Sequence, residues 1–500
     1  MISESAILKC EADLDFIIAE PESSFLKSQT VEGARSLYLS AQNPIVEAMA
    51  KLKHTPTGRE FHCGSLALKR LNDIATRLIN ERDDATDWDA TELSDFLKST
   101  LLNYLFAEGV SSSEQIIVPW LEAGLKSVRA RHRRFTHYVP CVAVQIGAKD
   151  IYTSGAITFK RKALFFDEIG SGIASYERAR DRLNSRVFRN SMPDQLDCLK
   201  GKGATRPNKA IETFKKFANM MEWVAIIPVK RCDYVVSEKR AEAALRVALS
   251  ASALLLQGTK GADLRIAGDP FEPWEKGKLS STGDKMFRPT SSWRFGTPMA
   301  DQDWPAYLQS VASPVLCVIH ELIKQILSGV PLTYGFKLAL RAITWYADAV
   351  RDTNQETRLI KCTTAIECLV LSSSGTATSS FVIRGAILAQ REDLSMIDCA
   401  AIASELYKQR SNIAHGNISE IPSKSESTSR ALAFTRNAVL QFLAICAQLK
   451  PLGPHREGTR EDFLEYYKQC EARFGVEIEE IKRRKLHTIR KTQQEEVAEK

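Results

Sequence analysis

The segment Leu406–Gly416, LYKQRSNIAHG, holds the residues from which the fold and chemistry of this chain are inferred. Apolar residues recur at helical steps through it and just before it, which predicts a helix with one apolar face (Ile402, Ala403, Leu406, Tyr407, Ile413). Gly416 is a favourable residue just beyond a helix, so the helix should end near His415. An imidazole exchanges protons near neutrality, and the fork of Arg410 fits a phosphate.

The spacing of Arg410 and His415 sets how they can cooperate. At five residues apart on a helix, two side chains differ by about 140° around the axis and about 7.5 Å along it. They do not stack like a pair four residues apart. Both can still reach one phosphodiester if the helix end loosens or if two copies of the chain face each other.

The pattern R-x4-H, closed by Gly416 and preceded by Leu406 and Tyr407, resembles the motif of the HEPN superfamily, specifically its Apea-like branch. The segment Ala365–Leu369, AIECL, resembles the acidic helix of that branch, with Glu367 as its acidic residue. The resemblance covers about residues 331–449, roughly a quarter of the chain.

The resemblance implies an all-α bundle that dimerises so that two motifs meet, and a metal-independent endoribonuclease. The ribose 2′-hydroxyl would attack the adjacent phosphate and leave a cyclic phosphate and a 5′-hydroxyl. It assigns acid–base catalysis to His415, stabilisation of the phosphorane to Arg410, and assistance to Asn412 or Ser411. Many nuclease members carry Asn, Asp or His directly after the Arg, whereas this chain has Ser411 there and Asn412 one position later.

Two supporting residues have alternative roles. Glu367 either orients Arg410 or His415 across the bundle or forms an ion pair between helices. Tyr407 lies three residues before Arg410, and packing in the core is the favoured role for it.

The resemblance also leaves alternative functions. In one, the HEPN-like bundle only dimerises or binds RNA as a scaffold, without catalysis. In another, the chain is the partner of a nucleotidyltransferase and is itself modified near the motif, although such partners are usually short. The preferred function, a bacterial toxin or antiphage nuclease, implies RNA (tRNA or mRNA) as substrate and a homodimer or higher oligomer. It also implies a front region that senses an unknown phage or cellular trigger.

Composition is that of an ordinary globular protein: 500 residues, 44% hydrophobic, 26% charged, with a net charge of +7. The length predicts two or three domains. The 11 cysteines include no C-x-x-C pair, which argues against a zinc ribbon. Asp348 and Asp352 are four residues apart, but no further metal ligands accompany them. The sequence has neither a P-loop nor a G-x-S-x-G motif, and no metal or cofactor is expected.

The location predicted from the sequence is the cytoplasm, with no membrane partner. The first residues contain early acids and no long apolar core, unlike a signal peptide. The longest apolar run, near Val247–Leu256, is far shorter than the roughly 20 residues that span a bilayer.

The predicted fold is mainly α overall: an α+β N-terminal region, followed by an all-α helical bundle. Residues 1–330 form the α+β sensor or regulatory region; as an alternative, this region divides into a helical segment over residues 1–136 and an α+β segment over residues 137–330. Residues 331–450 form the bundle, and 451–500 a helical extension. Helices are expected over residues 44–52, 61–80, 87–107, 116–130, 177–187, 209–221, 237–256, 313–327, 336–350, 356–371, 381–390, 396–415, 427–449 and 460–490.

Strands are expected in the middle of the front region. Alternating and β-branched residues over His137–Phe166, with turns near Gly147 and Gly155, predict antiparallel hairpins. WVAIIPV, at 223–229, predicts a short buried strand, and Ser237 is the expected N-cap of the helix that follows. Gly, Pro and Ser cluster over 260–298, which predicts loops or short β pieces.

A basic run in the front region is a second candidate contact for RNA. Its charges alternate with Phe135 and Tyr138, whose rings could stack on bases (Arg129, Arg131, Arg133, Arg134). A solvated helix end before a strand is the favoured alternative.

Overall fold

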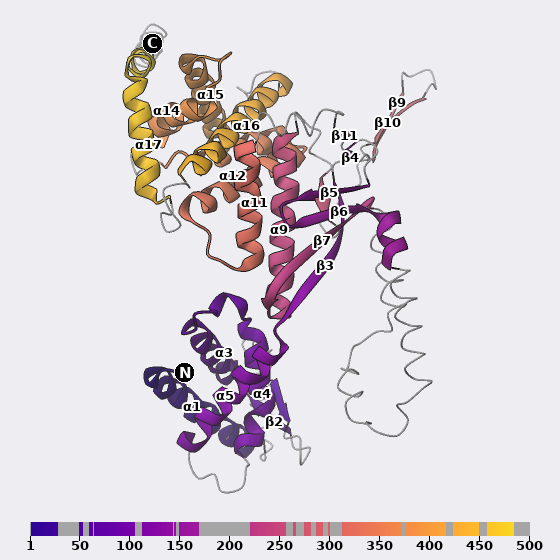
Figure 1. Cartoon of the computed structure of the whole chain (residues 1–500), viewed down its shortest axis with the longest axis vertical. Helices are drawn as coiled ribbons and strands as arrows, with labels where there is room; N and C mark the ends of the chain where they lie inside the picture. The colour runs from indigo at the N-terminus through magenta and orange to yellow at the C-terminus, as the bar shows by residue number, and fades with distance from the viewer. Residues whose placement is uncertain are drawn as a thin grey trace. The chain divides into compact units, whose positions relative to one another are not determined.

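The computed structural model is mainly helical and contains a small β-sheet (Figure 1). It describes residues 2–28, 50–53, 60–63, 65–105, 113–143, 145–146, 150–169, 221–256, 264–266, 275–281, 287–293, 299–300, 313–371, 377–416, 424–449 and 458–484. The helices predicted at 177–187 and 209–221 lie outside these residues, apart from the last residue of the second.

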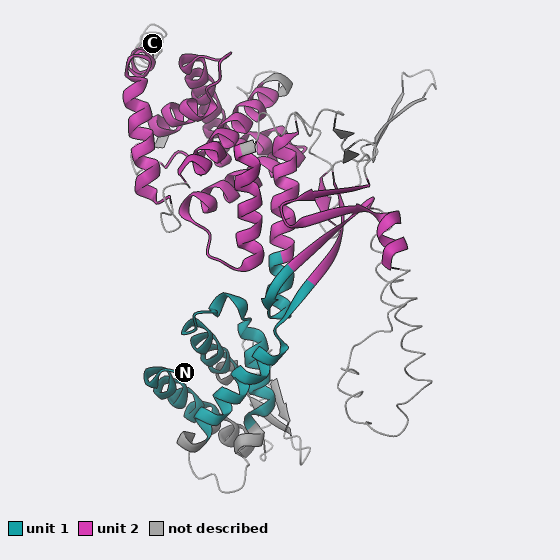
Figure 2. Ribbon diagram, in the orientation of Figure 1, with its two compact units in different colours: residues 1–135, 229–240 teal, residues 136–228, 241–500 magenta. Residues whose placement is uncertain are grey.

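Two compact units make up the chain, as coloured in Figure 2. The first contains residues 1–135 and 229–240, and the second contains 136–228 and 241–500. The continuous part of the first unit therefore ends near the division expected at residue 136. The unit also includes a short segment from later in the chain, residues 229–240. The boundary expected near residue 331 lies within the second unit.

The first unit is built mainly from helices. They are α1 (Glu4–Ser28), α3 (Ser65–Asn80), α4 (Ala90–Leu105) and α5 (Ser113–Arg131), with a 3-10 turn η1 (Ala85–Asp87) and a hairpin of β1 (Ala50–Lys53) and β2 (Glu60–Cys63). Three of the predicted helices are thus present, but two predicted segments were wrong in places. Ala50–Lys53 and the residues just before α3 pair as antiparallel strands instead of continuing helices.

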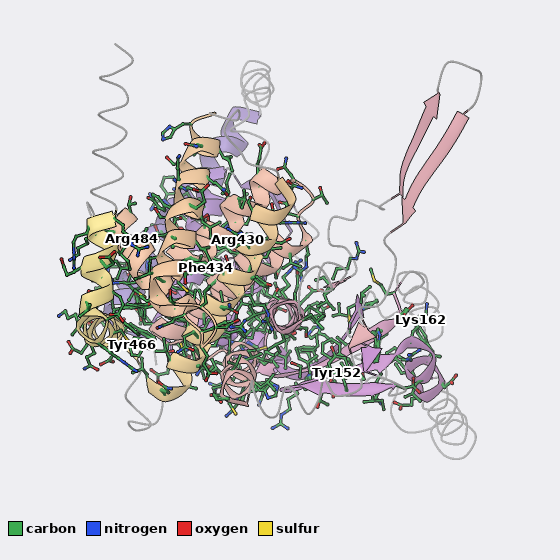
Figure 3. All side chains as sticks on the ribbon, turned by 90° about the horizontal axis from the view of Figure 1, so that it is seen from above. Tyr152, Lys162, Arg430, Phe434, Tyr466 and Arg484 are labelled. Carbon is green, nitrogen blue, oxygen red and sulfur yellow. The ribbon has the colours of Figure 1, made fainter. Side chains whose placement is uncertain are left out.

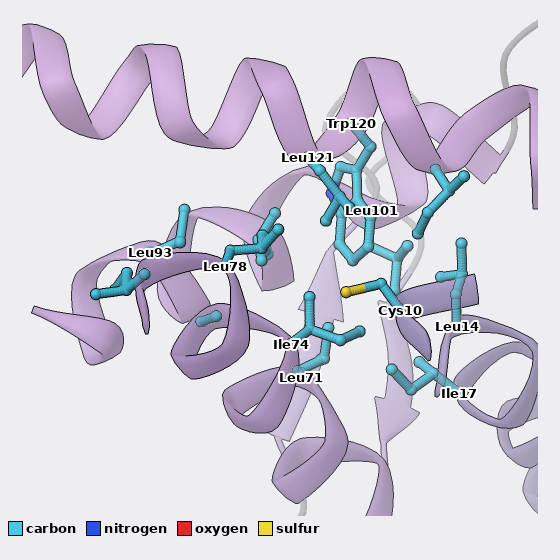
Figure 4. Close-up of a cluster of buried hydrophobic side chains, with 14 of the residues drawn as sticks. Cys10, Leu14, Ile17, Leu71, Ile74, Leu78, Leu93, Leu101, Trp120 and Leu121 are labelled. Carbon is cyan, nitrogen blue, oxygen red and sulfur yellow. The ribbon is translucent and has the colours of Figure 1, made fainter. Parts of the chain in front are cut away.

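Buried apolar side chains from α1, α3, α4 and α5 form one core in this unit (Figure 4). Trp120 of α5 lies within it, fully buried, and the indole N–H donates to the Thr100 hydroxyl at 3.2 Å. Asp13 of α1 accepts from Arg70 and Arg77 of α3, at 2.6 and 3.1 Å. The apolar faces and this paired carboxylate hold α1 against α3, although no helix was predicted from the sequence at α1.

A segment from later in the chain, residues 229–240, joins the first unit through polar contacts. The backbone N–H of Asp233 donates to the Asp87 carbonyl at 3.0 Å. The Arg240 guanidinium pairs with the Asp87 carboxylate at 2.8 Å, and Arg231 donates to the His132 carbonyl at 2.9 Å. These contacts link residues about 100 or more positions apart, beyond the reach of local sequence patterns.

The sheet of the second unit has the strand order β5-β6-β7-β3-β8. Its strands are β3 (Arg133–Val142), β5 (Ile151–Ser154), β6 (Ile157–Arg161), β7 (Trp223–Cys232) and β8 (Arg265–Ile266). β5 and β6 form the predicted hairpin, whose turn contains Gly155 at φ +60°. Tyr152, labelled in Figure 3, stacks on Phe159 across this hairpin with ring centroids 4.6 Å apart.

Two strand predictions need correction. β3 does not form a hairpin with β5, because β6 and β7 lie between them in the sheet. Residues 162–169 form a helix, although the strand region was expected to continue to Phe166. Short β pieces occur as predicted between 260 and 300, namely β8, β9 (Glu275–Ser281), β10 (Phe287–Trp293) and β11 (Met299–Ala300); β11 pairs with β4 (Gln145–Ile146).

Helix α9 (Tyr234–Leu255) follows β7 and begins earlier than expected. The Asp233 carboxylate accepts from the Val235 N–H at 2.8 Å, so it caps the helix in place of Ser237. The Ser237 hydroxyl instead donates to the Tyr234 carbonyl within the first turn.

The remaining helices form the bundle, and the predicted ones are all present. They are α11 (Ser313–Ser328), α12 (Tyr334–Arg351), α13 (Gln355–Glu367), α14 (Ala377–Ala389), α15 (Met396–Ala414), α16 (Lys424–Leu449) and α17 (Arg460–Arg473). The last helix is interrupted at Phe474 before a further helical stretch, 475–484. Residues Ser427–Leu449 of α16 are apolar and long enough to cross a membrane, yet 56% of the most apolar window is buried inside the molecule.

Candidate functional site

Helix α15 carries the R-x4-H motif and has defined ends. The Ser395 hydroxyl accepts from the Asp398 N–H at 3.1 Å and caps its N-terminus. At the other end His415 is the C-cap, and Gly416 follows at φ +77° with its N–H donating to the Ile413 carbonyl at 3.1 Å. The prediction that the helix ends near His415 is therefore confirmed.

The helix end leaves the His415 side chain exposed to solvent. Arg410, one and a half turns earlier, is partly exposed, with 39% of its side chain accessible. Ser411 and Asn412 are half-buried between them, and the Ser411 carbonyl accepts the His415 N–H at 3.0 Å. The motif thus places a cation and an imidazole at one accessible helix end.

Glu367, the last residue of α13, pairs with Arg410 across the bundle. Its Oε1 lies 3.9 Å from the Arg410 Nε, which is longer than a hydrogen bond. Burial raises the pKa of the Glu367 carboxyl, and the Arg410 charge opposes that rise. A loose pair with both side chains about a third exposed contributes little to stability, so the guanidinium can exchange Glu367 for another anion at low cost.

Tyr407 packs in the bundle, as expected from its position. Its ring lies against Phe381 of α14, with centroids 5.1 Å apart. Gln409, which sequence reasoning passed over, is buried next to Arg410 and donates to Glu405 at 2.8 Å. Packing on these two residues fixes the rotation of α15, and thereby the side on which Arg410 lies.

The end of α13 is held by residues from α14 and α17. Leu371, just past the helix, has a positive φ of 50°, which is unusual for a leucine. Arg384 donates to the Val370 and Leu371 carbonyls at 2.9 and 3.1 Å, and its Nε donates to Glu471 of α17 at 2.9 Å. The buried Tyr467 hydroxyl donates to the Leu369 carbonyl at 2.9 Å. These bonds satisfy backbone carbonyls of the turn that follows α13.

The basic residues of the front region belong to the first unit, whereas the motif belongs to the second. Arg129, Arg131, Arg133 and Arg134 are all exposed. Arg131 lies 3.4 Å from Glu92, as in a solvated helix end. His132, in the same run, is buried against Trp88, and this burial lowers the pKa of its imidazole.

The ring of Phe135 contacts Tyr234 at 5.5 Å, and that of Tyr138 contacts Phe165 at 5.3 Å. Both rings therefore have protein partners, although Tyr138 remains 43% exposed. The stacking role predicted for this run stays a prediction.

The carboxylates considered as metal ligands are paired with basic side chains. Asp348 lies 3.5 Å from Arg351, and Asp352 lies 2.5 Å from Lys361, so each carboxylate has a cation partner. Within the described residues, no cluster of three or more His, Cys, Asp or Glu side chains could hold a metal ion. Cys362 and Cys446 are buried, and Cys368 is half-buried and caps the end of α13.

Comparisons with protein-family profiles, with curated proteins and with solved structures found no match to this chain. The functional assignment therefore depends on the residues of the site and on their geometry.

Proposed function

We propose that this chain is a metal-independent endoribonuclease of the HEPN type, with its site at the C-terminal end of α15. The observation that supports this most is the accessible pair at one helix end: an exposed His415, and an Arg410 held only loosely by Glu367. A guanidinium in this state offers donors to a phosphate, and a solvent-facing imidazole can exchange protons with the ribose.

The reaction would be transfer of a phosphoryl group within the RNA. An imidazole accepts the proton of the 2′-hydroxyl, and the 2′-oxygen forms a bond to the adjacent phosphorus. The bond from phosphorus to the 5′-oxygen breaks, and that oxygen takes a proton from an imidazolium. Arg410 would neutralise the extra charge on the phosphorane, with Asn412 or Ser411 as a further donor. The products are a 2′,3′-cyclic phosphate and a 5′-hydroxyl, with no net gain or loss of protons.

One chain supplies a single motif, whereas the reaction uses both a base and an acid. Two copies would bring two His415 side chains to one phosphate, so that one accepts a proton while the other donates. Arg410 and His415 of one chain point in directions about 140° apart around the axis of α15, which favours this composite arrangement.

The test is RNA cleavage by purified full-length protein. We expect fragments with cyclic phosphate ends, and a loss of roughly 100- to 10,000-fold in rate for His415→Ala. Arg410→Ala should also lose cleavage. Lys408→Ala is the matched control, since Lys408 is an exposed cation on the same helix, and it should retain full activity. Equal cleavage by wild type and His415→Ala would refute the proposal.

A non-catalytic scaffold that dimerises and binds RNA is the second candidate. The observation in its favour is Ser411, which stands where a stronger hydrogen-bonding residue follows the Arg in many nucleases of the family. RNA binding without cleavage, unchanged by His415→Ala, would support the scaffold.

A further inference from the structure

A row of exposed side chains runs along α12, on the surface of the helix that faces away from the core. Lys337, Arg341 and Trp345 are spaced four residues apart and are all exposed. The opposite face of α12 is buried, including Phe336, Leu338, Ala342, Ile343 and Tyr346. Four-residue steps place side chains one above another, so the three residues form a continuous row about 12 Å long. We call these three residues the α12 row.

The α12 row combines two features that stability does not explain. Trp345 leaves 37% of its surface in water, although a tryptophan gains most when buried. Among the residues that the structure describes, no side chain forms a hydrogen bond or an ion pair with Lys337 or Arg341. By contrast, Arg351 at the end of the same helix lies 3.5 Å from Asp348.

Helix α12 packs against α13, whose last residue, Glu367, pairs with Arg410 of the candidate nuclease site. The Arg341 charge is near enough to the Cys368 thiol to lower its pKa, against the larger effect of burial. The Glu367 charge acts on the same thiol in the opposite direction, and Glu367 pairs with Arg410. One end of α13 therefore connects the row to the arginine of the motif.

We propose that the α12 row is a binding track for a single-stranded segment of RNA adjacent to the cleaved bond. Arg341 and Lys337 contact phosphates, and the Trp345 ring stacks on a base. Two exposed cations in line with one exposed ring match the backbone charge and the base faces of a single strand. A protein partner or a second copy would instead be expected to cover a wider apolar face. This inference rests on the proposed function, because it takes RNA as the ligand.

Binding without cleavage tests the row independently of catalysis. The protein used is full-length His415→Ala, and the probes are fluorescent single-stranded and duplex RNA of equal length. Adding Trp345→Ala should weaken single-strand binding by about tenfold, the typical value for one stacked base. Trp345→Phe should restore most of it. Duplex binding should respond less, because its bases are already stacked.

The two cations have a separate signature. Arg341→Ala and Lys337→Ala should each lower the slope of log affinity against log salt by about 0.7, the value for one contact to a single-stranded phosphate. Lys324→Ala on α11 is the matched control, since this lysine is exposed and lies 3.5 Å from Glu321. It should leave affinity and slope unchanged.

Several outcomes would overturn the inference. One is unchanged single-strand affinity in Trp345→Ala and Arg341→Ala. Another is no RNA binding by any variant. A third is a change in oligomeric mass by light scattering in Trp345→Ala with RNA affinity intact, which would make the row a contact between copies. If wild type cleaves RNA and the variants of the α12 row bind single-stranded RNA as tightly as the parent protein, this inference is refuted but the proposed nuclease function is not.

Discussion

Charged residues are used differently in the two units of this protein. In the first unit, Arg240 is buried and pairs with Asp87 at 2.8 Å, while also donating to the Thr86 carbonyl. In the second, Arg410 is 39% exposed and lies 3.9 Å from Glu367. A buried guanidinium that is paired with a carboxylate fixes structure, since breaking the pair would leave a charge out of water without its partner. A loosely paired, accessible one is available to a ligand.

Removal of the buried arginine should have the largest effect on stability. Arg240→Ala leaves Asp87 without its partner, and we expect a loss of about 3 kcal/mol in the free energy of unfolding of the first unit. Hydrogen exchange on peptides from residues 65–131 would measure it. Arg246→Ala is the control, because Arg246 lies on the same helix in an exposed pair with Glu242, and its loss should cost under about 1 kcal/mol. Equal effects of the two changes would contradict the contrast.

The stability of the first unit should depend on pH through Asp233, another buried ionisable residue of the contacts made by residues 229–240. Burial raises the pKa of Asp233 to about 7, and a side-chain hydrogen bond and the charge of Glu92 act in the same direction. The unfolded chain releases this proton at about pH 4, whereas the folded unit keeps it to about pH 7. In that range the folded state binds more protons, so this group's contribution to stability falls as the pH rises from about 4 to about 7, and is level above that.

Asp233→Asn should remove this dependence. The amide oxygen can still accept the Val235 N–H bond, so the cap on α9 is retained. Relative to wild type, the variant should therefore become more stable as the pH is raised from about 5 to about 7.5, as followed by the midpoint of urea unfolding. An identical pH profile in the two proteins would show that Asp233 does not titrate in this range.

The smallest effect is expected for the exposed pair. Arg410→Ala should change the free energy of unfolding of the second unit by less than about 1 kcal/mol, because both partners are about a third exposed to water. A thermal melt of this variant beside wild type measures it. A large loss of stability would assign Arg410 a structural role and would remove the distinction from Arg240.

Helices of the bundle could be predicted from the sequence because their apolar spacing and caps are local. The end of α15 is an example, since Gly416 marks it directly. The order of the sheet could not be predicted, because β3 lies between β7 and β8, which come about 80 and 120 residues later. For the same reason, namely the long separation in sequence, the inclusion of residues 229–240 in the first unit could not be predicted.

The candidate site divides in the same way. Arg410, His415 and Glu367 were found from the motif and its neighbouring helix. Arg341 and Trp345 belong to no known motif, and their relevance follows from the packing of α12 against α13. The four-residue spacing of Lys337, Arg341 and Trp345 is the one signal in the sequence that could have suggested them.

The bonds at the end of α13 have a consequence for the order in which the molecule is made. Tyr467 and Glu471, which bond to the carbonyl of Leu369 and the guanidinium of Arg384, both belong to α17. During translation, the helix that ends at Glu367 is synthesised about 100 residues before these two side chains are available to it. The end of α13, and with it the support of Glu367, therefore reaches its final arrangement only after α17 has been synthesised.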